Sequence, residues 1–137
     1  MDEEPLIAIW QEKVAATAAM GEWQIKWVLE NHSSRTLEIS SLTIPHGQFK
    51  ATPLDFDPKL VVEPGCKMHF LTVVRCNESA GLVTENAFLI FAGHWGDQPT
   101  RLFARVRVDL VKEKGPLVNL QSLTSQRIGV SAEWVTR

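Results

Sequence analysis

The sequence predicts an all-β fold, an antiparallel β-sandwich of about seven strands with a C-terminal extension. Residues 101–111 alternate between small or apolar side chains and mostly charged ones, which is typical of a strand with one buried face. Shorter alternating segments recur along the chain, with turn signals at close spacing between them. Because no long segment has the period of a helix, a sandwich or a small barrel is the expected architecture.

Length and composition indicate one globular domain. The chain has 137 residues, of which 45% are apolar and 22% charged. A chain of this length buries roughly two thirds of its unfolded surface, so it needs neither a disulfide nor a metal to fold. We expect a β-sandwich over residues 1–116 and a C-terminal extension over residues 117–137 that packs on it or is partly frayed.

Charge and cysteine positions narrow the classes of function. The net charge of −2 argues against nucleic-acid binding, which usually needs a basic domain. The acidic start at residues 1–4 is unlike a secretory signal, and no apolar run approaches the ~20 residues of a membrane span. We therefore expect a cytoplasmic protein without membrane contact. Cys66 and Cys76 end one predicted strand, roughly 33 Å apart at ~3.3 Å per residue, too far for a disulfide.

The first part of the chain contains three of the expected strands. Residues 5–18 are ambiguous between strand and helix, and we favour a strand because a hairpin through Met20-Gly21 follows. Residues 22–30 then alternate cleanly. The next strand, residues 36–44, changes parity after Ser40-Ser41, which predicts a β-bulge at the serines.

Turn residues divide the middle of the chain. We expect residues 48–58 to form a loop or a short edge segment, and residues 60–62 to form a short strand. Glu63-Pro64-Gly65 has proline and glycine at the positions that a type II turn requires. Residues 66–76 alternate again and form the next strand, and the chain turns after it at residues 77–81.

The last part of the chain contains the alternating strand of residues 101–111. Residues 87–92 are apolar on both faces, residues 93–100 are expected to form a loop, and residues 117–137 a packed extension or an extra strand. The expected core consists of the apolar sides of the alternating segments: Trp23, Ile25, Trp27, Leu29, Met68, Phe70, Val74, Leu102, Ala104, Val106 and Val108.

Several of these positions resemble a known family. Asn31 follows the second predicted strand, Leu37-Glu-Ile39 begins the third, and Leu60-Val-Val-Glu-Pro64-Gly65 precedes Phe70. This arrangement resembles intracellular immunoglobulin-like domains of the major-sperm-protein kind over residues 22–111. The resemblance implies an immunoglobulin-like sandwich that serves as a scaffold or an interaction module. The Cys…Trp…Cys framework and the tyrosine corner of antibody domains are absent.

Few residues point to catalysis or to a bound cofactor. His46 and His94 lie in predicted loops and could meet Asp55 or Asp57 at a metal, but loop histidines more often bond solvent. No Gly-x-Ser-x-Gly elbow is present, so we expect no enzyme, no metal and no cofactor. Together with Trp95, whose ring could stack on a sugar, the two histidines form a possible ligand loop.

The strongest candidate is a surface. Residues 87–92 should pair with residues 101–111, so an apolar strip should lie beside arginines, with either Phe88 and Ile90 or Leu89 and Phe91 facing outward. Arginine and aromatic residues are enriched at protein interfaces. We assign the surface to Phe88, Ile90, Arg101, Phe103, Arg105 and Arg107. A partner, a second copy, or residues 117–137 could cover it.

We therefore expect a non-catalytic protein-interaction or structural module that binds another protein or itself. A small-ligand or carbohydrate-binding sandwich is the alternative, and an enzyme of unknown reaction is the third. A flat apolar strip would favour the module, and a concave site lined by tryptophan and polar groups would favour the ligand-binding protein. Two titratable groups with shifted pKa values in one cleft would favour the enzyme.

Overall fold

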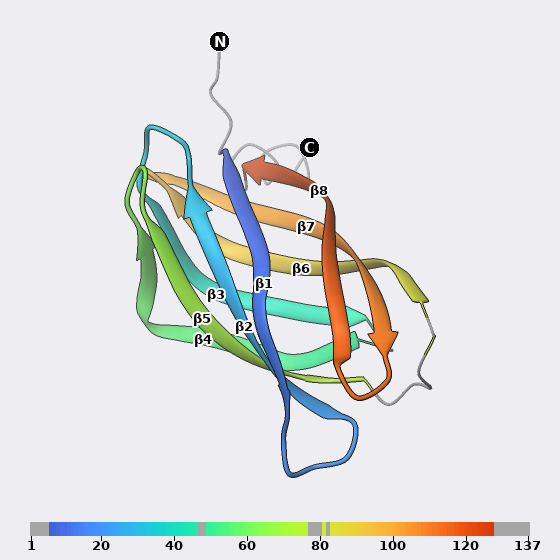
Figure 1. Cartoon of the computed structure of the whole chain (residues 1–137). Coiled ribbons are helices and arrows are strands. Elements are labelled where there is room, and N and C mark those ends of the chain that lie inside the picture. Colours follow the sequence, from blue (N-terminus) through green and yellow to red (C-terminus); the bar gives the residue numbers. More distant parts are fainter. Residues whose placement is uncertain (1–5, 47–48, 77–80, 82, 128–137) are drawn as a thin grey trace, which may run out of the picture.

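The computed structural model describes residues 6–46, 49–76, 81 and 83–127 of the chain. Within these ranges the protein is all-β (Figure 1). The strands are β1 (Ile7–Ala16), β2 (Glu22–Asn31), β3 (Leu37–His46), β4 (Phe49–Val62), β5 (Lys67–Arg75), β6 (Val83–Trp95), β7 (Gln98–Val111) and β8 (Gly115–Arg127).

The strands form one antiparallel sheet in the order β1-β2-β5-β4-β3-β6-β7-β8. The sheet curls until β1 and β8 lie side by side, so it is nearly closed like a barrel (Figure 1). The expectation of an all-β antiparallel fold is confirmed. The expected number of about seven strands was too low by one, because residues 115–127 form the additional strand β8.

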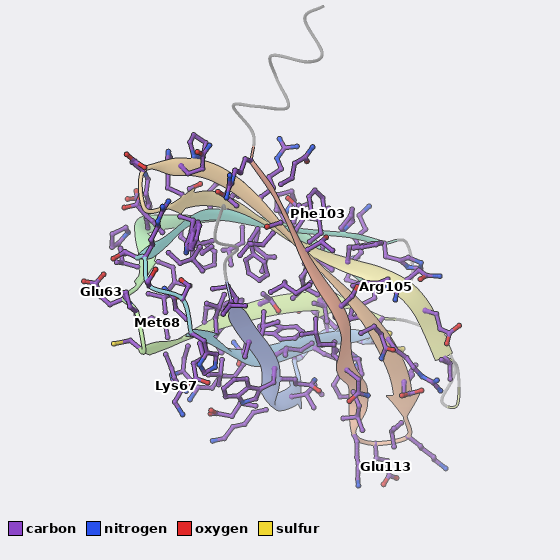
Figure 2. The ribbon with its side chains drawn as sticks, turned by 90° about the horizontal axis from the view of Figure 1, so that it is seen from above. Glu63, Lys67, Met68, Phe103, Arg105 and Glu113 are labelled. Carbon is purple, nitrogen blue, oxygen red and sulfur yellow. The ribbon has the colours of Figure 1, made fainter. Side chains whose placement is uncertain are left out.

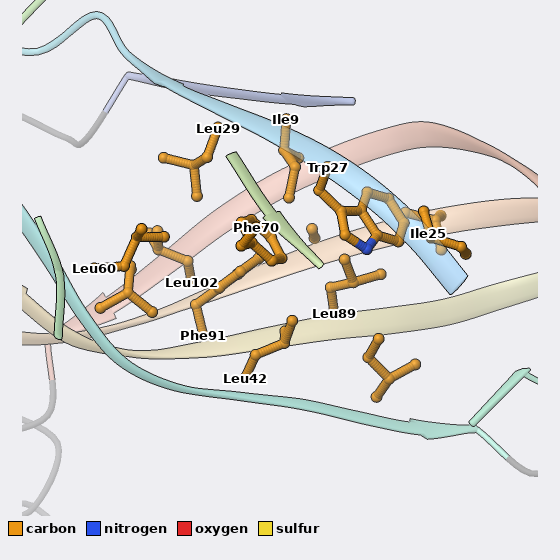
Figure 3. Close-up of a cluster of buried hydrophobic side chains, with 14 of the residues drawn as sticks. Ile9, Ile25, Trp27, Leu29, Leu42, Leu60, Phe70, Leu89, Phe91 and Leu102 are labelled. Atoms are coloured by element: carbon orange, nitrogen blue, oxygen red, sulfur yellow. The ribbon is translucent and has the colours of Figure 1, made fainter. Parts of the chain in front are cut away.

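Inward-facing side chains fill the interior of this sheet (Figure 3). Trp27 stacks with Phe70 at a centroid distance of 6.4 Å, and the Phe70 ring meets Phe91 edge to face at 5.9 Å. The alternation correctly predicted these core members: Ile25, Trp27, Leu29, Phe70, Val74, Leu102, Ala104, Val106 and Val108. Trp23 is only partly buried. Met68 was wrongly placed in the core, because it lies near the start of β5 and is 38% exposed (Figure 2).

Two local predictions from the sequence are confirmed. Between Ile39 and Ser41, β3 has one residue more than its neighbour β6, which is the bulge expected at the serines. The turn before β5 has Gly65 at φ +78°, and the Cys66 N–H donates to the Glu63 carbonyl at 3.0 Å. Only glycine adopts that backbone conformation readily, as a type II turn requires.

Residues 49–58, which were expected to form a loop or a short edge segment, are instead most of the 14-residue strand β4, so the loop prediction was wrong. Pro53 and Pro58 interrupt the alternation there, which concealed the strand. Prolines are tolerated on a strand where one edge lacks a partner or where the pairing shifts. Both conditions hold here. β4 pairs with β5 only at Lys50 and Ala51, and its register with β3 shifts beside each proline: between Leu42 and Ile44 at Pro53, and between Ile39 and Ser41 at Pro58.

The loop expected at residues 93–100 was also wrong. Trp95 ends β6 and pairs with Gln98 at the start of β7, so only two residues, Gly96 and Asp97, form the turn. Gly96 has φ +63°, which suits the first position of a tight type II′ hairpin. The hairpin carries Trp95 into the core, where it is 1% exposed.

The C-terminal extension begins as a strand. Residues 115–127 form β8, which pairs with β7 from Val111 back to Thr100. The remainder of the expected extension, residues 128–137, lies outside the described residues, as does most of the turn expected at residues 77–81.

Buried polar contacts connect one end of the barrel. The amide of Asn31, which is 0% exposed, donates to the carbonyls of Arg35 and Val62 at 2.8 and 2.9 Å. Its oxygen accepts from the backbone N–H and the hydroxyl of Ser33 at 2.9 and 2.6 Å. The Asn31 backbone also bonds Cys66 and Gly65 in the turn before β5. All four hydrogen-bonding positions of the amide are filled. We call this cluster the Asn31 hub.

Candidate functional site

The outward side of β6 and β7 brings together the surface residues named from the sequence. Leu89 and Phe91 are buried, so Phe88 and Ile90 are the outward pair on β6. In the register of the two strands, Ile90 lies opposite Phe103. Phe88, Ile90 and Phe103 are all half-buried. We call this surface, with Arg101, Arg105 and Arg107, the arginine face.

The three arginines of this face differ in how far they are engaged. Arg107 lies 3.3 Å from Asp109 and 3.8 Å from Glu85, so two carboxylates already balance its charge. Arg105 donates to the Asn86 side chain at 3.3 Å and has no carboxylate within ion-pair distance in the described part of the chain. Arg101 is exposed and likewise has no carboxylate partner among the residues described.

Strand β8 extends the arginine face and does not cover it. Phe103 lies opposite Thr124, and Arg105 lies opposite Ser122, so β8 places polar side chains beside the apolar row. Strands paired edge to edge share a surface, whereas a covering segment must cross it. The described part of the C-terminal extension therefore leaves Phe103 and Arg105 accessible on the outside of the barrel (Figure 2).

The residues of the expected ligand loop are not brought together. His94 lies in β6 beside Glu38, with 4.0 Å between Nδ1 and Oε1. His46 is the last residue of β3, eight positions after Glu38, which is roughly 26 Å away along an extended strand. No three His, Cys, Asp or Glu side chains in the described ranges could hold a metal ion together.

Trp95 has a structural position at the Asn31 hub. Its indole Nε1 donates to the Ser33 hydroxyl at 2.8 Å, and the Arg35 guanidinium lies over its ring at 4.7 Å. A buried tryptophan normally needs a partner for its N–H, and this one has it. The ring is therefore occupied by the protein itself and offers no surface for a sugar.

One carboxylate has a shifted pKa. The hydrogen bond from Lys26 is the main cause that lowers the pKa of Glu12, and His69 adds to the effect at 3.1 Å. Glu12 lies on the exposed side of β1. A lowered pKa on an exposed surface is typical of a surface ion pair, whereas a general acid needs a raised one.

A second candidate site lies where the sheet opens between β4 and β5. The two strands pair only at Lys50 with Arg75 and at Ala51 with Val74, and then diverge until a turn rejoins them at residues 63–66. The opening has a volume of about 710 Å³, within the range of small-molecule and peptide sites. We call it the β4–β5 groove.

The groove has an apolar lining with charged residues at one end. Leu42, Ile44 and Leu54 form the apolar part that faces the core, and Thr72 joins them with its hydroxyl accepting from the Trp27 indole at 2.8 Å. On the outer side the walls are formed by Thr52, Pro53, Leu71 and Val73. The charged residues at the paired end are Glu22, Lys50 and Arg75.

This groove was not predicted from the sequence. The alternation of β5 places Lys67, His69 and Arg75 outward, and Leu71 and Val73 share that parity. The side chains of Leu71 and Val73 are 51% and 45% exposed. Two apolar residues on the solvent side of a strand are the signal that could have indicated the site.

Comparison with known proteins assigns no family. No family model matches the chain, and no curated protein matches it significantly. In the part of the chain that the structure describes, no helix has the length and apolar character needed to cross a lipid bilayer.

Proposed function

We propose that the chain is a non-catalytic protein-interaction module and that the arginine face is its contact surface. The observation that carries this proposal is the row of Phe88, Ile90 and Phe103, half-buried on the outward side of two paired strands. Outward strand positions are usually polar, and contiguous apolar residues on a surface usually mark a binding site. Phe103 lies at the centre, and Arg101 and Arg105 lie beside it.

The charges of the arginine face favour an acidic partner. Neither Arg101 nor Arg105 has a carboxylate partner within the described chain, whereas Arg107 has two. An arginine at the border of an apolar contact attracts carboxylates and selects against a basic partner. The partner is therefore a protein with an apolar patch edged by Asp or Glu, and a second copy of the chain is the other candidate.

The relationship to intracellular immunoglobulin-like domains belongs to the same proposal. It is supported by Asn31 at the end of β2 and by the Pro64-Gly65 turn directly before β5, the positions on which the resemblance rests. Domains of that kind serve as scaffolds or interaction modules inside cells, and a cytoplasmic location follows from the same proposal.

A photo-reactive amino acid at position 103 tests the contact surface in living cells. We expect it to crosslink to a protein partner or to a second copy, because Phe103 lies at the centre of the face. The same amino acid at Lys59, exposed on the outer side of β4, is the control. Equal crosslinking at both positions, or none at position 103, would contradict the proposal. Solution mass as a function of concentration then separates self-association from a different partner.

A further inference from the structure

We propose that the β4–β5 groove binds the C-terminal end of a partner polypeptide as an extended segment. The last residue of that segment is apolar, and its free carboxylate is recognised by Lys50 and Arg75. This site goes beyond the arginine face and shares no residue with it, so either proposal can fail without the other.

The open strand edges supply the first argument. β5 pairs with β2 along its whole length but with β4 only at Val74 and Arg75. Residues 67–73 therefore present one edge that no described strand covers. An exposed edge offers unpaired N–H and C=O groups, and an extended peptide is the ligand that satisfies them.

The apolar lining supplies the second argument. Leu71 and Val73 remain about half exposed on the groove wall, and Leu42, Ile44 and Leu54 line the side toward the core. A volume of about 710 Å³ accommodates a large apolar side chain together with the extended backbone that carries it. A peptide strand whose terminal side chain faces inward would remove this lining from water.

The charged end supplies the third argument. Lys50 and Arg75 lie directly opposite each other, and like charges in that position repel. Neither has a carboxylate within ion-pair distance among the described residues. Glu22 lies opposite Arg75 on β2, and its carboxylate accepts a hydrogen bond from the Thr17 hydroxyl at 2.7 Å. Among the described lining residues, one negative charge against two positive ones leaves this end of the groove cationic, and a ligand carboxylate would balance it.

The closure of the groove makes the ligand a chain terminus. Where Lys50 pairs with Arg75, the two strands are joined, so an inserted chain cannot continue past that point. An internal Asp or Glu would require the chain to turn back there, whereas a C-terminal carboxylate needs no further room. With its end at Arg75, the peptide runs parallel to β5 and antiparallel to β4.

Affinity selection with two peptide libraries tests the site on the whole protein. Both contain heptapeptides of randomised sequence; one library has free carboxylates, and the other is amidated at the C-terminus. We expect retained peptides to end in Leu, Ile, Val or Phe. The free acid of a retained sequence should bind about tenfold or more tightly than its amide, the scale of one charge-assisted hydrogen bond.

Paired variants locate the binding. The double variant Lys50→Gln and Arg75→Gln should lose the preference for the free acid while keeping the melting temperature. Lys59→Gln with Lys112→Gln removes the same charge from exposed positions elsewhere and should leave the preference unchanged. In the wild type, a selected peptide should slow amide hydrogen exchange at Leu71 or Val73, because it pairs with the open edge of β5.

Three outcomes would overturn the inference. They are the retention of no peptide from either library, equal binding of acids and amides by the wild type, and a preference for the free acid that survives the Lys50→Gln and Arg75→Gln changes. Decanoate, which has a carboxylate and an apolar tail but no peptide backbone, is the remaining comparison. If decanoate occupies the groove and no peptide is retained, the site recognises an amphiphile and the proposal of a peptide ligand is wrong.

Discussion

The nearly closed sheet is interrupted at two places, and the protein treats them differently. Between β1 and β8, the side chain of Gln11 replaces the missing ladder: Nε2 donates to the Pro116 carbonyl at 2.8 Å, and Oε1 accepts from the Val118 N–H at 3.0 Å. Between β4 and β5, the strands diverge beyond Ala51, and the rings of Phe56 and Phe70 meet edge to face at 5.7 Å.

The difference separates a structural joint from a binding site. At the β1–β8 seam one amide bonds both a donor and an acceptor of the opposite edge, so that edge is partly satisfied within the molecule. At the β4–β5 groove, apolar walls and two cations face the opening. Changes at the seam should therefore alter stability, and changes in the groove should alter binding.

Trp27 connects the two interruptions, and its replacement should have the largest effect. It lies on β2 between β1 and β5, is 2% exposed, and donates to Thr72 in the groove. Trp27→Ala should lower the free energy of unfolding by about 3–5 kcal/mol, because it leaves a large cavity. Denaturant unfolding measures the loss. Trp27→Phe keeps most of the volume but not the hydrogen bond, so it should lower the free energy of unfolding by less. A loss below about 1 kcal/mol for Trp27→Ala would mean that the ring is not buried.

Opening the β1–β8 seam should have the next largest effect. Gln11→Leu keeps the approximate size of the side chain but removes two hydrogen bonds to partly buried backbone groups. We expect a loss of about 1–3 kcal/mol in the free energy of unfolding. The amide of Val118 should also exchange faster. Gln24→Leu, at an exposed position on the neighbouring strand, is the matched control and should change stability by no more than about 0.5 kcal/mol.

The groove wall should contribute little to stability. The double variant Leu71→Thr and Val73→Thr changes two side chains that are already about half exposed, so we expect a change within about 0.5 kcal/mol per site. The same variant should bind selected peptides more weakly, because the apolar walls are reduced. A stability loss as large as that of Gln11→Leu would mean that these side chains belong to the core and that the comparison fails.

The smallest expected effect is a change in one titration. Glu12 lies at the bulge of β1, next to Gln11, and Lys26 lowers the pKa of its carboxyl. Lys26→Gln should raise the pKa of Glu12 toward the ordinary value of a glutamate, which carboxyl carbon NMR measures directly. His69 remains as a second partner at 3.1 Å, so part of the lowering should persist.

The sequence predicted which side of a strand is buried better than which edge of a strand is paired. Alternation correctly placed Trp27, Phe70 and Val106 in the core, because a strand with one buried face has an apolar residue at every second position. The alternation pattern does not indicate which strands pair with each other. β4 and β5 follow each other in the chain, yet they pair only at Lys50 and Ala51. This pairing depends on how the whole sheet curls.

The candidate sites show the same difference between features that alternation predicts and features that depend on the folded arrangement. For the arginine face, the outward residues of β7 could be predicted because that strand alternates, whereas the outward pair of β6 stayed open because residues 87–92 are apolar on both faces. The role of Trp95 could not be predicted from the sequence. Its N–H partner, Ser33, lies 62 positions away in the chain and meets it only after folding. The β4 prediction failed for a different reason: Pro53 and Pro58 are usual marks of a loop, and here they lie on a strand with an open edge.

The Asn31 hub sets an order for local opening of the molecule. It connects the end of β2, the end of β4 and the turn before β5, and through Ser33 it reaches Trp95. Segments that share saturated buried contacts open as one cooperative unit, while thinly bonded regions open first. In native-state hydrogen exchange the hub should be among the last units to open, and the Lys50–Arg75 end among the first. The barrel can thus open locally at the Lys50–Arg75 end, where a peptide would bind, while the end that contains the Asn31 hub stays closed.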